Sequence, residues 1–435
     1  MNKGQNLYRK AKKVIPGGTM LLSKRPEMFL PENWPSYYSK AKGCEVWDLD
    51  NNKFTDVSIM GIGTNTLGYG HPKVDEAVLE TVKKGNMSTL NCPEEVALAE
   101  KLIEINPWAD MVRFARSGGE ANSIAIRIAR AASGKDKVAI CGYHGWHDWY
   151  LSTNLKNDNQ LDDHLLPGLD PAGVPKGLIG TTFPFLYNDF EALLDIVENN
   201  DIGVIKMEVQ RNLPPEDNFL HKVRELATKK GIVLIFDECT SGFRETFGGI
   251  FKKFNVEPDI AMFGKTLGNG YGITAVVGRK EVMQAAQKTF ISSTFWTERI
   301  GPTAALATLD VMEEIKSWDL ITEIGKKVSN KWQEIADNTN VKINRAGLPS
   351  LSTFSFDSKK ALEYKTYVTQ EMLKKGYLAN TSFYAATSHT ESKLSPYFED
   401  LHAVFKMINK FESDQLDINE FLEGPVCHGG FKRLN

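Results

Sequence analysis

The chain has 435 residues, of which 42% are hydrophobic and 25% are charged, and its formal net charge is −3. This length predicts two packed domains, or one large domain with an appended smaller one. The charge balance favours neither a nucleic-acid-binding protein nor a polybasic membrane surface, so any anion must be bound at a local site. Residues 1–13 lack the apolar core of a secretory signal, and no apolar run could span a bilayer. We therefore expect a soluble, cytoplasmic protein that binds neither nucleic acid nor membrane.

The elements expected along the chain fall into three parts. The first holds a short helix, the turn Pro16-Gly17-Gly18 and the strand-like segment Cys44–Leu49. In the middle part, short β-branched runs alternate with helical patterns. The last part, after Pro302, holds a long helical stretch, the alternating segment Leu351–Phe356 and a helix near Leu401–Lys410. The expected strands of the middle part are Lys137–Tyr143, Ile202–Val209, Ile232–Glu238 and Asp259–Phe263, and its expected helices include Asp189–Glu198 and Phe219–Lys230.

This alternation predicts an α/β domain with a largely parallel sheet and helices on both faces. Neither end of the chain has a full core of its own, so we expect the two ends to pack together as a second domain. The expected boundaries place residues 1–55 and 301–435 in that domain and residues 56–300 in the large one.

Cysteine usage and histidine spacing bear on disulfides and metals. The cysteines are five, widely spaced and without a C-x-x-C pair, which argues against a disulfide framework or a zinc knuckle. His144, His147 and Asp148 lie close together in the sequence, but their spacing lacks a clear further metal ligand. We expect no metal, and polar lining of a cofactor pocket or a loop is the favoured role of these three side chains.

The segment Arg116–Asn122 is a candidate anion site. Apolar residues after it repeat at the spacing of one helix face, and Ser117 is a good N-cap residue for that helix. Gly118 and Gly119 would let backbone N–H groups approach a ligand closely at the positive end of the helix dipole. Taken alone, the segment is more typical of an ordinary capped helix with a Gly-Gly turn.

Two expected strands end in ionisable residues. The run Ile232–Phe236 leads into Asp237, whose carboxylate would need a cationic partner if buried, and a protonated heterocycle nitrogen would serve. The other strand leads through Gly264 into Lys265, whose pKa desolvation would lower, making it a competent amine nucleophile. Each residue also has a simpler explanation. Asp237 could cap the turn that follows its strand, and Lys265 could be solvated or could bind phosphate as a point charge.

The three features together match the needs of pyridoxal 5'-phosphate (PLP). A helix N-terminus would bind the phosphate, a carboxylate would keep the pyridine nitrogen protonated, and a lysine would bind the aldehyde as a Schiff base. Ser117–Gly119, Asp237 and Lys265 supply these three contacts in one α/β unit. The sequence therefore predicts a PLP site.

On these residues the chain resembles the class III PLP-dependent aminotransferases, and within them the glutamate-1-semialdehyde 2,1-aminomutase-like proteins. The resemblance covers nearly the whole chain. It implies fold type I of the PLP-dependent transferases, with a mostly parallel seven-stranded sheet in the large domain and a smaller α+β domain built from both termini. The matching motifs are Ala11–Gly18, Leu67–Pro72, Ser117–Asn122, Gly142–Gly145, Asp237–Phe243, Gly264-Lys265 and Thr387–Thr390.

The resemblance also implies roles for individual residues. Lys265 would carry PLP and shuttle the substrate proton, Asp237 would pair with the ring nitrogen, and Tyr143 would stack on the ring. Thr294 matches a threonine that reaches the phosphate of the neighbouring subunit, which implies an obligate homodimer. The full set of implied cofactor-binding residues is Ser117, Gly118, Gly119, Tyr143, His144, Glu208, Asp237, Cys239, Lys265 and Thr294.

Departures from the family pattern lie mostly around the substrate. Gly119 replaces the threonine of Ser-Gly-Thr-Glu-Ala and removes a hydroxyl donor to the phosphate. Val209 replaces the proline of Glu-Pro, and Thr381 stands where the aminomutases carry a glutamate. The segment 296–299, Trp-Thr-Glu-Arg, replaces the usual Gly-Asn-Pro. The candidate substrate-binding residues are Lys24, which aligns with an arginine of the aminomutases, and Arg25, Arg211, Glu298 and Arg299.

We expect an aminotransferase that moves an amino group from a donor, glutamate, to a polar carbonyl acceptor such as a sugar or sugar acid. The aromatic and hydroxyl-bearing insert Phe295–Arg299 motivates the choice of acceptor. The first alternative is glutamate-1-semialdehyde 2,1-aminomutase, which exchanges the amine within one molecule. A PLP-fold binding module without turnover is disfavoured because Asp237 and Lys265 are intact. A nucleotide-binding Rossmann protein is disfavoured because no G-x-G-x-x-G follows the first strand.

Overall fold

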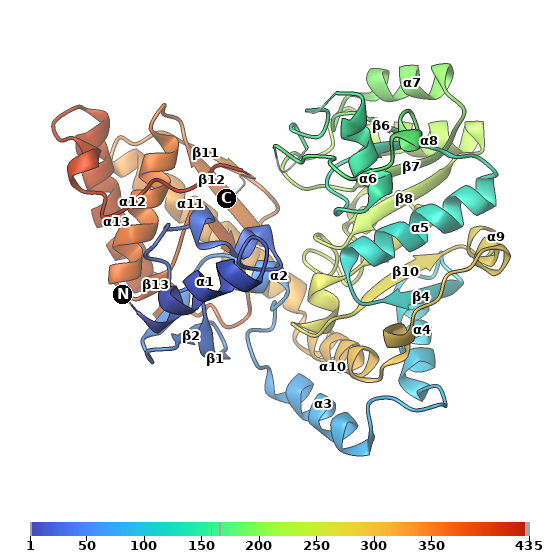
Figure 1. Ribbon diagram of the computed structural model, residues 1–435, viewed down its shortest axis with the longest axis horizontal. Coiled ribbons are helices and arrows are strands. Elements are labelled where there is room, and N and C mark those ends of the chain that lie inside the picture. Colours follow the sequence, from blue (N-terminus) through green and yellow to red (C-terminus); the bar gives the residue numbers. More distant parts are fainter. Residues whose placement is uncertain (1, 158, 165–166, 431–435) are drawn as a thin grey trace. The chain divides into compact units, whose positions relative to one another are not determined.

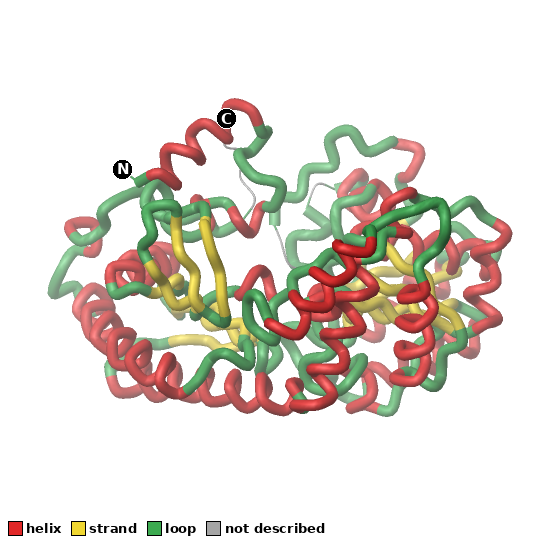
Figure 2. The backbone as a smooth tube through the Cα atoms, turned by 90° about the horizontal axis from the view of Figure 1, so that it is seen from below, coloured by secondary structure: helices red, strands yellow, loops and turns green. Residues whose placement is uncertain are grey.

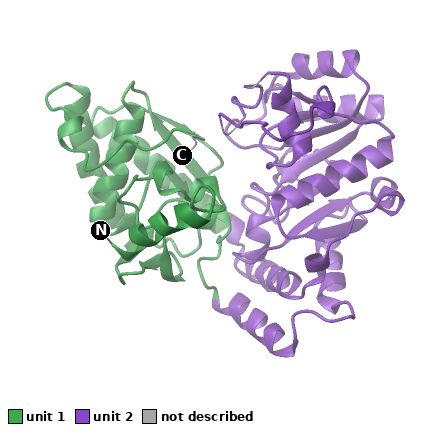
Figure 3. Ribbon diagram, in the orientation of Figure 1, with its two compact units in different colours: residues 1–71, 319–435 green, residues 72–318 purple. Residues whose placement is uncertain are grey.

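The computed structural model describes residues 2–157, 159–164 and 167–430. The chain divides into two compact units (Figure 3): residues 1–71 with 319–435 form unit 1, and residues 72–318 form unit 2. Unit 1 is thus built from two separate stretches of the chain, and unit 2 from one continuous stretch. Within the described residues, no helix is long and apolar enough to cross a membrane.

Both unit boundaries fall later in the chain than residues 55 and 300, the boundaries expected from the sequence. Residues 56–71 stay with unit 1, where Gly43 pairs with Tyr69 in a β-bridge and the N–H of Tyr384 donates to the carbonyl oxygen of Ser58 over 2.7 Å. The helix α10 (Ile300–Ile315) stays with unit 2 because it packs against α3 (Pro72–Lys84) and α4 (Pro93–Ile105). Both sets of contacts join residues far apart in the sequence, so the local sequence pattern did not indicate them.

A seven-stranded sheet is the centre of unit 2 (Figure 1). Its order is β4-β10-β9-β8-β7-β5-β6, and the pairs β5–β6, β5–β7, β7–β8 and β8–β9 are parallel. β10 runs antiparallel to both of its neighbours. The strands are β4 (Met111–Ala115), β5 (Lys137–Cys141), β6 (Thr182–Pro184), β7 (Ile202–Glu208), β8 (Val233–Glu238), β9 (Ile260–Phe263) and β10 (Thr274–Gly278). The mostly parallel, seven-stranded sheet expected for fold type I is confirmed.

The central strands are continuous apolar runs because both of their faces are covered. Val233 and Ile235 of β8 belong to a core cluster shared with α5 (Gly118–Ser133), which contacts five strands. Leu234 and Phe236 alternate with them and are also fully buried, as expected for a strand with helices on both faces. Figure 2 shows the strands of this unit surrounded by helices.

The helices of unit 2 follow the strands in the order expected from the sequence, and α8 has the predicted bounds. The remaining α-helices are α6 (Asp148–Leu151), α7 (Phe190–Asn199), α8 (Phe219–Lys230) and α9 (Lys280–Met283). The 3-10 helices are η3 (Ser152–Leu155), η4 (Lys176–Leu178), η5 (Ile250–Phe254), η6 (Lys265–Gly268), η7 (Gln284–Lys288) and η8 (Thr294–Thr297).

Unit 1 contains two small sheets and several helices. One sheet has the order β1-β2-β3-β13 and the other β11-β12-β14. Their strands are β1 (Tyr38–Lys42), β2 (Glu45–Asp48), β3 (Lys53–Asp56), β11 (Ile343–Ala346), β12 (Leu351–Phe356), β13 (Tyr377–Leu378) and β14 (Ser382–Tyr384). The helices are α1 (Lys3–Val14), η1 (Leu22–Lys24), η2 (Pro26–Met28), α2 (Met60–Gly63), α11 (Ser317–Asn338), α12 (Ala361–Lys374), α13 (Glu391–Glu412) and η9 (Ile418–Glu420).

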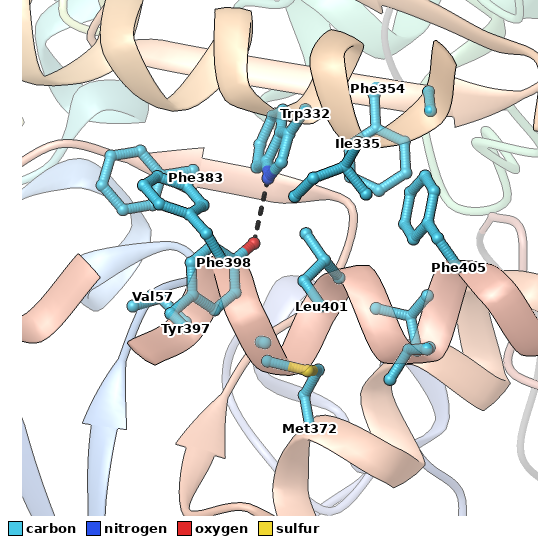
Figure 4. Close-up of a cluster of buried hydrophobic side chains, with 14 of the residues drawn as sticks. Val57, Trp332, Ile335, Phe354, Met372, Phe383, Tyr397, Phe398, Leu401 and Phe405 are labelled. Atoms are coloured by element: carbon cyan, nitrogen blue, oxygen red, sulfur yellow. Dashed lines mark hydrogen bonds between the residues drawn. The ribbon is translucent and has the colours of Figure 1, made fainter. Parts of the chain in front are cut away.

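Unit 1 has its own apolar core (Figure 4). Trp332 of α11 is fully buried, and its indole Nε1 donates to the Tyr397 hydroxyl of α13 over 3.0 Å. Val57 and Phe383 join the same cluster from distant parts of the chain, which ties the N-terminal and C-terminal segments into one unit. The expected helix near Leu401–Lys410 begins earlier, at Glu391, although Pro396 lies inside it.

Candidate active site

Lys265 lies at the first position of η6, directly after β9. Its φ of +42° is a left-handed conformation that costs a non-glycine residue roughly 1–3 kcal/mol and is concentrated at functional sites. The ammonium donates to Thr240 Oγ1 over 2.6 Å, and no ion pair is recorded for Lys265 within the described residues. Burial lowers the pKa of Lys265 to about 8, and the nearby Arg211 guanidinium acts in the same direction. About a tenth of this amine is therefore neutral at pH 7, far more than for an ordinary lysine.

Asp237 lies at the end of β8, beside β9, and only 4% of it is exposed. Its Oδ2 is 2.9 Å from His144 Nδ1 and 3.3 Å from Lys206 Nζ, and its Oδ1 accepts from Cys239 N over 3.1 Å. Burial would raise the pKa of Asp237, but the Lys206 ammonium and the His144 hydrogen bond hold it well below its usual range. Asp237 is thus a buried anion near neutral pH, as a partner for a protonated ring nitrogen must be.

Lys206 was not among the predicted site residues. Its side chain is fully buried in β7, and its Nζ also lies 3.1 Å from Met262 Sδ. The signal was present in the sequence, because a lysine inside the apolar strand Ile202–Glu208 requires a buried anionic partner. Thr240, the hydrogen-bond partner of Lys265, was also not among the predicted site residues. A threonine in a turn has no sequence feature that indicates such a contact.

The end of β7 carries a second charged cluster. Glu208 Oε1 pairs with Arg211 Nη1 over 2.6 Å, and Glu208 Oε2 accepts from the backbone N–H of Tyr143 over 3.2 Å. A Cβ on Gly142 would lie 2.6 Å from Glu208 Oε2, and Gly142 has a φ of +106°, so glycine is required for this approach. The Tyr143 ring packs edge-on against Tyr150, with centroids 6.0 Å apart. Glu208 therefore links a candidate ring-stacking residue to a candidate substrate-binding arginine.

The N-terminus of α5 is built as an anion site. Ser117 is the N-cap and forms a capping box with Glu120, so these two side chains satisfy each other's backbone groups. No acceptor is recorded, among the described residues, for the N–H groups of Gly118 and Gly119. A Cβ on Gly118 would meet no atom within 4 Å, so open space lies before this helix end.

Thr274 of β10 connects this helix end to the Lys265 region. Its Oγ1 donates to the carbonyl oxygen of Ser117 over 3.4 Å. A Cβ on Gly264 would lie 3.0 Å from Thr274 Cγ2 and 3.4 Å from Cys239 Sγ, so the three residues pack closely together. The sheet thereby brings the helix N-terminus, the lysine and the acid to one region of unit 2.

The segment 294–299 contributes mainly internal contacts. Thr294 is exposed at the start of η8. Glu298 pairs with Arg116 over 2.8 Å and accepts from the first N–H groups of α10, at Ile300 and Gly301. Arg299 makes two 2.8 Å contacts with the carboxylate of Glu94. Glu298 and Arg299 thus have structural partners within unit 2, and their roles in substrate binding stay predictions.

The two remaining candidate substrate residues lie in unit 1. Lys24 is exposed in η1, and Arg25 follows it. A Cβ on Gly17 would lie 2.4 Å from Arg25 Nη2, so the guanidinium packs against this glycine. Their proposed contact with a substrate carboxylate also stays a prediction.

The residues of unit 2 fit PLP. The buried carboxylate of Asp237 is anionic, and the amine of Lys265 has a lowered pKa. Two N–H groups at a helix N-terminus have no acceptor recorded among the described residues. A metal site finds no such support, since no group of three or more potential protein ligands is assembled in the described parts of the chain.

Comparisons with known proteins agree with this interpretation. The sequence model of the class-III aminotransferases matches residues 31–386. The 3-aminobutyryl-CoA aminotransferase of Cloacimonas acidaminovorans (strain Evry) is 34% identical over 381 residues, covering 85% of this chain and 87% of that protein. The glutamate-1-semialdehyde 2,1-aminomutase of Methanococcoides burtonii is 30% identical over 427 residues, covering 92% and 98%.

Solved structures agree on the fold. The FumI protein of Sphingopyxis sp. MTA144, solved in its PLP internal aldimine form, superimposes with a TM-score of 0.85 over 97% of this chain and 99% of that chain, at 21% identity. An omega-transaminase from Sphaerobacter thermophilus gives a TM-score of 0.81 over 94% and 97%, at 23% identity.

Proposed function

Since the chain belongs to the class-III aminotransferase family of PLP-dependent enzymes, we propose that it moves an amino group from glutamate to a polar carbonyl acceptor, a sugar or sugar acid. The observation that carries this proposal is the placement of Arg211, paired with Glu208, near the amine of Lys265. The aminotransferase class and the PLP requirement follow from the family. The donor, the acceptor and the roles of individual residues are part of the proposal.

PLP supplies a carbonyl that takes up the donor's amino group and a ring that delocalises the electrons left when the Cα proton is lost. Lys265 provides the amine that holds the cofactor and then accepts and returns that proton, which its pKa of about 8 suits. Asp237 keeps the pyridine nitrogen protonated, because it is a buried anion near neutral pH. His144 and Lys206 position that carboxylate and offset the cost of burying it.

The N–H groups of Gly118 and Gly119 bind the phosphate, with Ser117 capping the helix that presents them. Tyr143 stacks on the ring, and Cys239 packs behind it, against Gly264. These contacts fix the position of the ring relative to Lys265.

The active unit is a homodimer in which Thr294 of each subunit reaches the phosphate of the other. Thr294 is exposed in the single chain, which suits a residue that completes a partner's site. Large apolar side chains in the same and nearby segments are also strongly exposed, which marks an interaction surface. These are Leu90 at 82%, Val96 at 61%, Phe290 at 83% and Phe295 at 70% exposed.

The Glu208–Arg211 pair supports glutamate as the donor. Arg211 is the partner that a donor carboxylate would take, because guanidinium and carboxylate form strong, charge-assisted hydrogen bonds. An acceptor without a carboxylate at that position leaves Arg211 paired with Glu208. One site could in this way bind a dicarboxylate donor and an uncharged carbonyl compound in turn.

A sugar-like acceptor would need an aromatic side chain with an available face. Trp149 is buried, and Trp296 donates its Nε1 to Glu120 Oε1 over 3.0 Å. Trp146 is 69% exposed and stacks on His147, so its outer face is available to a flat apolar surface of a ligand.

A carbonyl panel with glutamate as donor tests the proposal. We expect 2-oxoglutarate to form beyond one equivalent per active site only when a sugar aldehyde or ketone is added, with one amine then gained by the sugar for each further glutamate consumed. 3-Aminobutyryl-CoA belongs in the panel as an alternative donor, because a relative acts on it. Turnover confined to that thioester would reject glutamate as the donor.

The aminomutase reaction is the alternative, favoured by 30% identity to the Methanococcoides burtonii protein over 92% of this chain. It exchanges the amine within one molecule and needs no separate donor. Conversion of glutamate-1-semialdehyde without added donor, together with no activity on the panel, would establish it in place of intermolecular transfer.

A further inference from the structure

Gly119 stands where the family often has a threonine, and the structure shows what fills the vacated space. A Cβ built on Gly119 would lie 2.5 Å from His147 Cε1 and 2.7 Å from His147 Nδ1. Real Cβ atoms do not come this close to ring atoms, so a threonine at 119 and the imidazole at its present position exclude each other. The imidazole nitrogen lies 2.7 Å from that Cβ, the atom that would carry the threonine hydroxyl.

The backbone holds His147 in this position. His147 is the N-cap of α6, and its carbonyl oxygen accepts from the N–H groups of Tyr150 and Leu151. Gly145 has a φ of +97°, and a Cβ on it would lie 3.3 Å from the Cα of Gly119, so two glycines allow the segments to approach. The imidazole stacks on Trp146, with centroids 4.4 Å apart.

The Nδ1 atom of His147 is buried, and no hydrogen-bond partner is found for it in the described parts of the chain. A buried polar nitrogen without a partner is costly, and such atoms are uncommon in folded proteins. Two N–H groups with no recorded acceptor lie on the same helix end, those of Gly118 and Gly119. His147 Nδ1, which carries a hydrogen in one of the two neutral tautomers, thus lies beside this helix end, and one anion could accept from all three groups.

We propose that His147 donates its Nδ1–H to the phosphate of PLP, in place of the hydroxyl that Gly119 lacks. This inference rests on the proposed binding of the phosphate at the N-terminus of α5. Gly119 and His147 then depend on each other. The glycine leaves space for the imidazole, and the imidazole N–H replaces the threonine hydroxyl as a donor to the phosphate. His147 would be a cofactor-binding residue with no part in proton transfer at the substrate.

Equilibrium binding to the apoenzyme tests this role without relying on activity. His147→Ala should weaken PLP binding about 10- to 100-fold, the range of a hydrogen bond to a charged group. Pyridoxal, which lacks the phosphate, should bind wild type and variant equally, since the ring contacts are unchanged. The Kd values would come from titration of the cofactor's visible absorbance, and the melting temperature of each apoenzyme would check its folding.

A residue swap provides the matched control. Gly119→Thr alone should weaken PLP binding, because the new side chain and the imidazole cannot both fit and the displaced ring crowds the helix end. The double variant Gly119→Thr/His147→Ala should regain most of the wild-type affinity, since a hydroxyl then takes the place of the ring nitrogen. A merely structural role for His147 predicts no such rescue.

Two results would overturn the inference: unchanged PLP affinity in a folded His147→Ala variant, or an equal loss of affinity for PLP and pyridoxal. These results are independent of whether the proposed reaction occurs, because both Kd values are measured without substrate. A further variant tests the placement of the phosphate by itself. Gly118→Pro removes one of the two N–H groups, so an unchanged PLP Kd in a folded apoenzyme would show that the phosphate does not bind at this helix end.

Discussion

The strand ends of β7, β8 and β9 differ from the segment 294–299 in how their charges are used. At the strand ends, Asp237 is held as a buried anion by Lys206 and His144, while Lys265 has no recorded carboxylate partner. In the segment 294–299, Glu298 and Arg299 are engaged by Arg116 and Glu94. An amine that must form a bond with an aldehyde cannot be held in an ion pair. Lys265 meets this requirement within the described residues, whereas Glu298 and Arg299 are both held in ion pairs.

The largest expected effect is at Lys265. Lys265→Ala removes both the amine that holds PLP and the group that moves the proton, so we expect kcat to fall at least about 10⁴-fold. Lys280→Ala, at an exposed lysine of the same unit, is the control and should keep wild-type kcat. Comparable rates for the two variants in a coupled glutamate assay would show that Lys265 has no part in catalysis.

The next effect is expected at Asp237. Asp237→Asn removes the anion that keeps the ring protonated and should lower kcat about 10²- to 10³-fold while PLP still binds. It also leaves the buried Lys206 ammonium unpaired, which should destabilise the protein by about 3–5 kcal/mol. Urea unfolding measures this loss, and Lys206→Met in the same variant should recover part of the stability without recovering kcat. Recovery of kcat would mean that Asp237 serves folding only.

Arg211 and Arg299 offer a direct comparison of the two regions. Arg211→Ala should raise KM for glutamate about 10- to 100-fold, by loss of a charge-assisted contact, while an amine donor without a carboxylate is affected little. Arg299→Ala should leave KM for glutamate nearly unchanged and lower the melting temperature, because it breaks the contacts with Glu94. The reverse outcome would assign donor binding to the segment 294–299.

The smallest effect concerns pH. The pKa of Lys265 is lowered from 10.5 to about 8, so its amine becomes nucleophilic as pH rises through 8. The rate constant with which apoenzyme captures PLP should therefore rise about tenfold between pH 7 and 9 and then level off. Stopped-flow absorbance would follow it. A rate that keeps rising toward pH 10.5 would show that Lys265 is solvated like an ordinary lysine.

The cofactor side of the site could be anticipated because its residues obey local rules. An apolar strand that ends in an acid, as at Asp237, places that acid at the carboxyl edge of a parallel sheet. Ser117 before a periodic apolar run predicts a capped helix, and the capping box with Glu120 agrees with it. The bounds of α8 and β12 were predicted for the same reason.

Other features depend on contacts between residues far apart in the sequence. The pairing of Arg299 with Glu94, and the imidazole of His147 in the space left by Gly119, exist only once the chain is folded. The expected unit boundaries at 55 and 300 missed residues 56–71 and α10 for this reason. Lys206 was within reach of sequence reasoning, since a lysine in a buried strand requires an anionic partner.

The central claim, that Lys265 carries PLP, has a direct chemical test. Borohydride reduction of the holoenzyme fixes the bond between the cofactor and its lysine, and peptide mass spectrometry then locates it. We predict that the cofactor mass is found on the peptide that contains Lys265 and on no other. Recovery of that mass on another lysine, Lys206 included, would contradict the account.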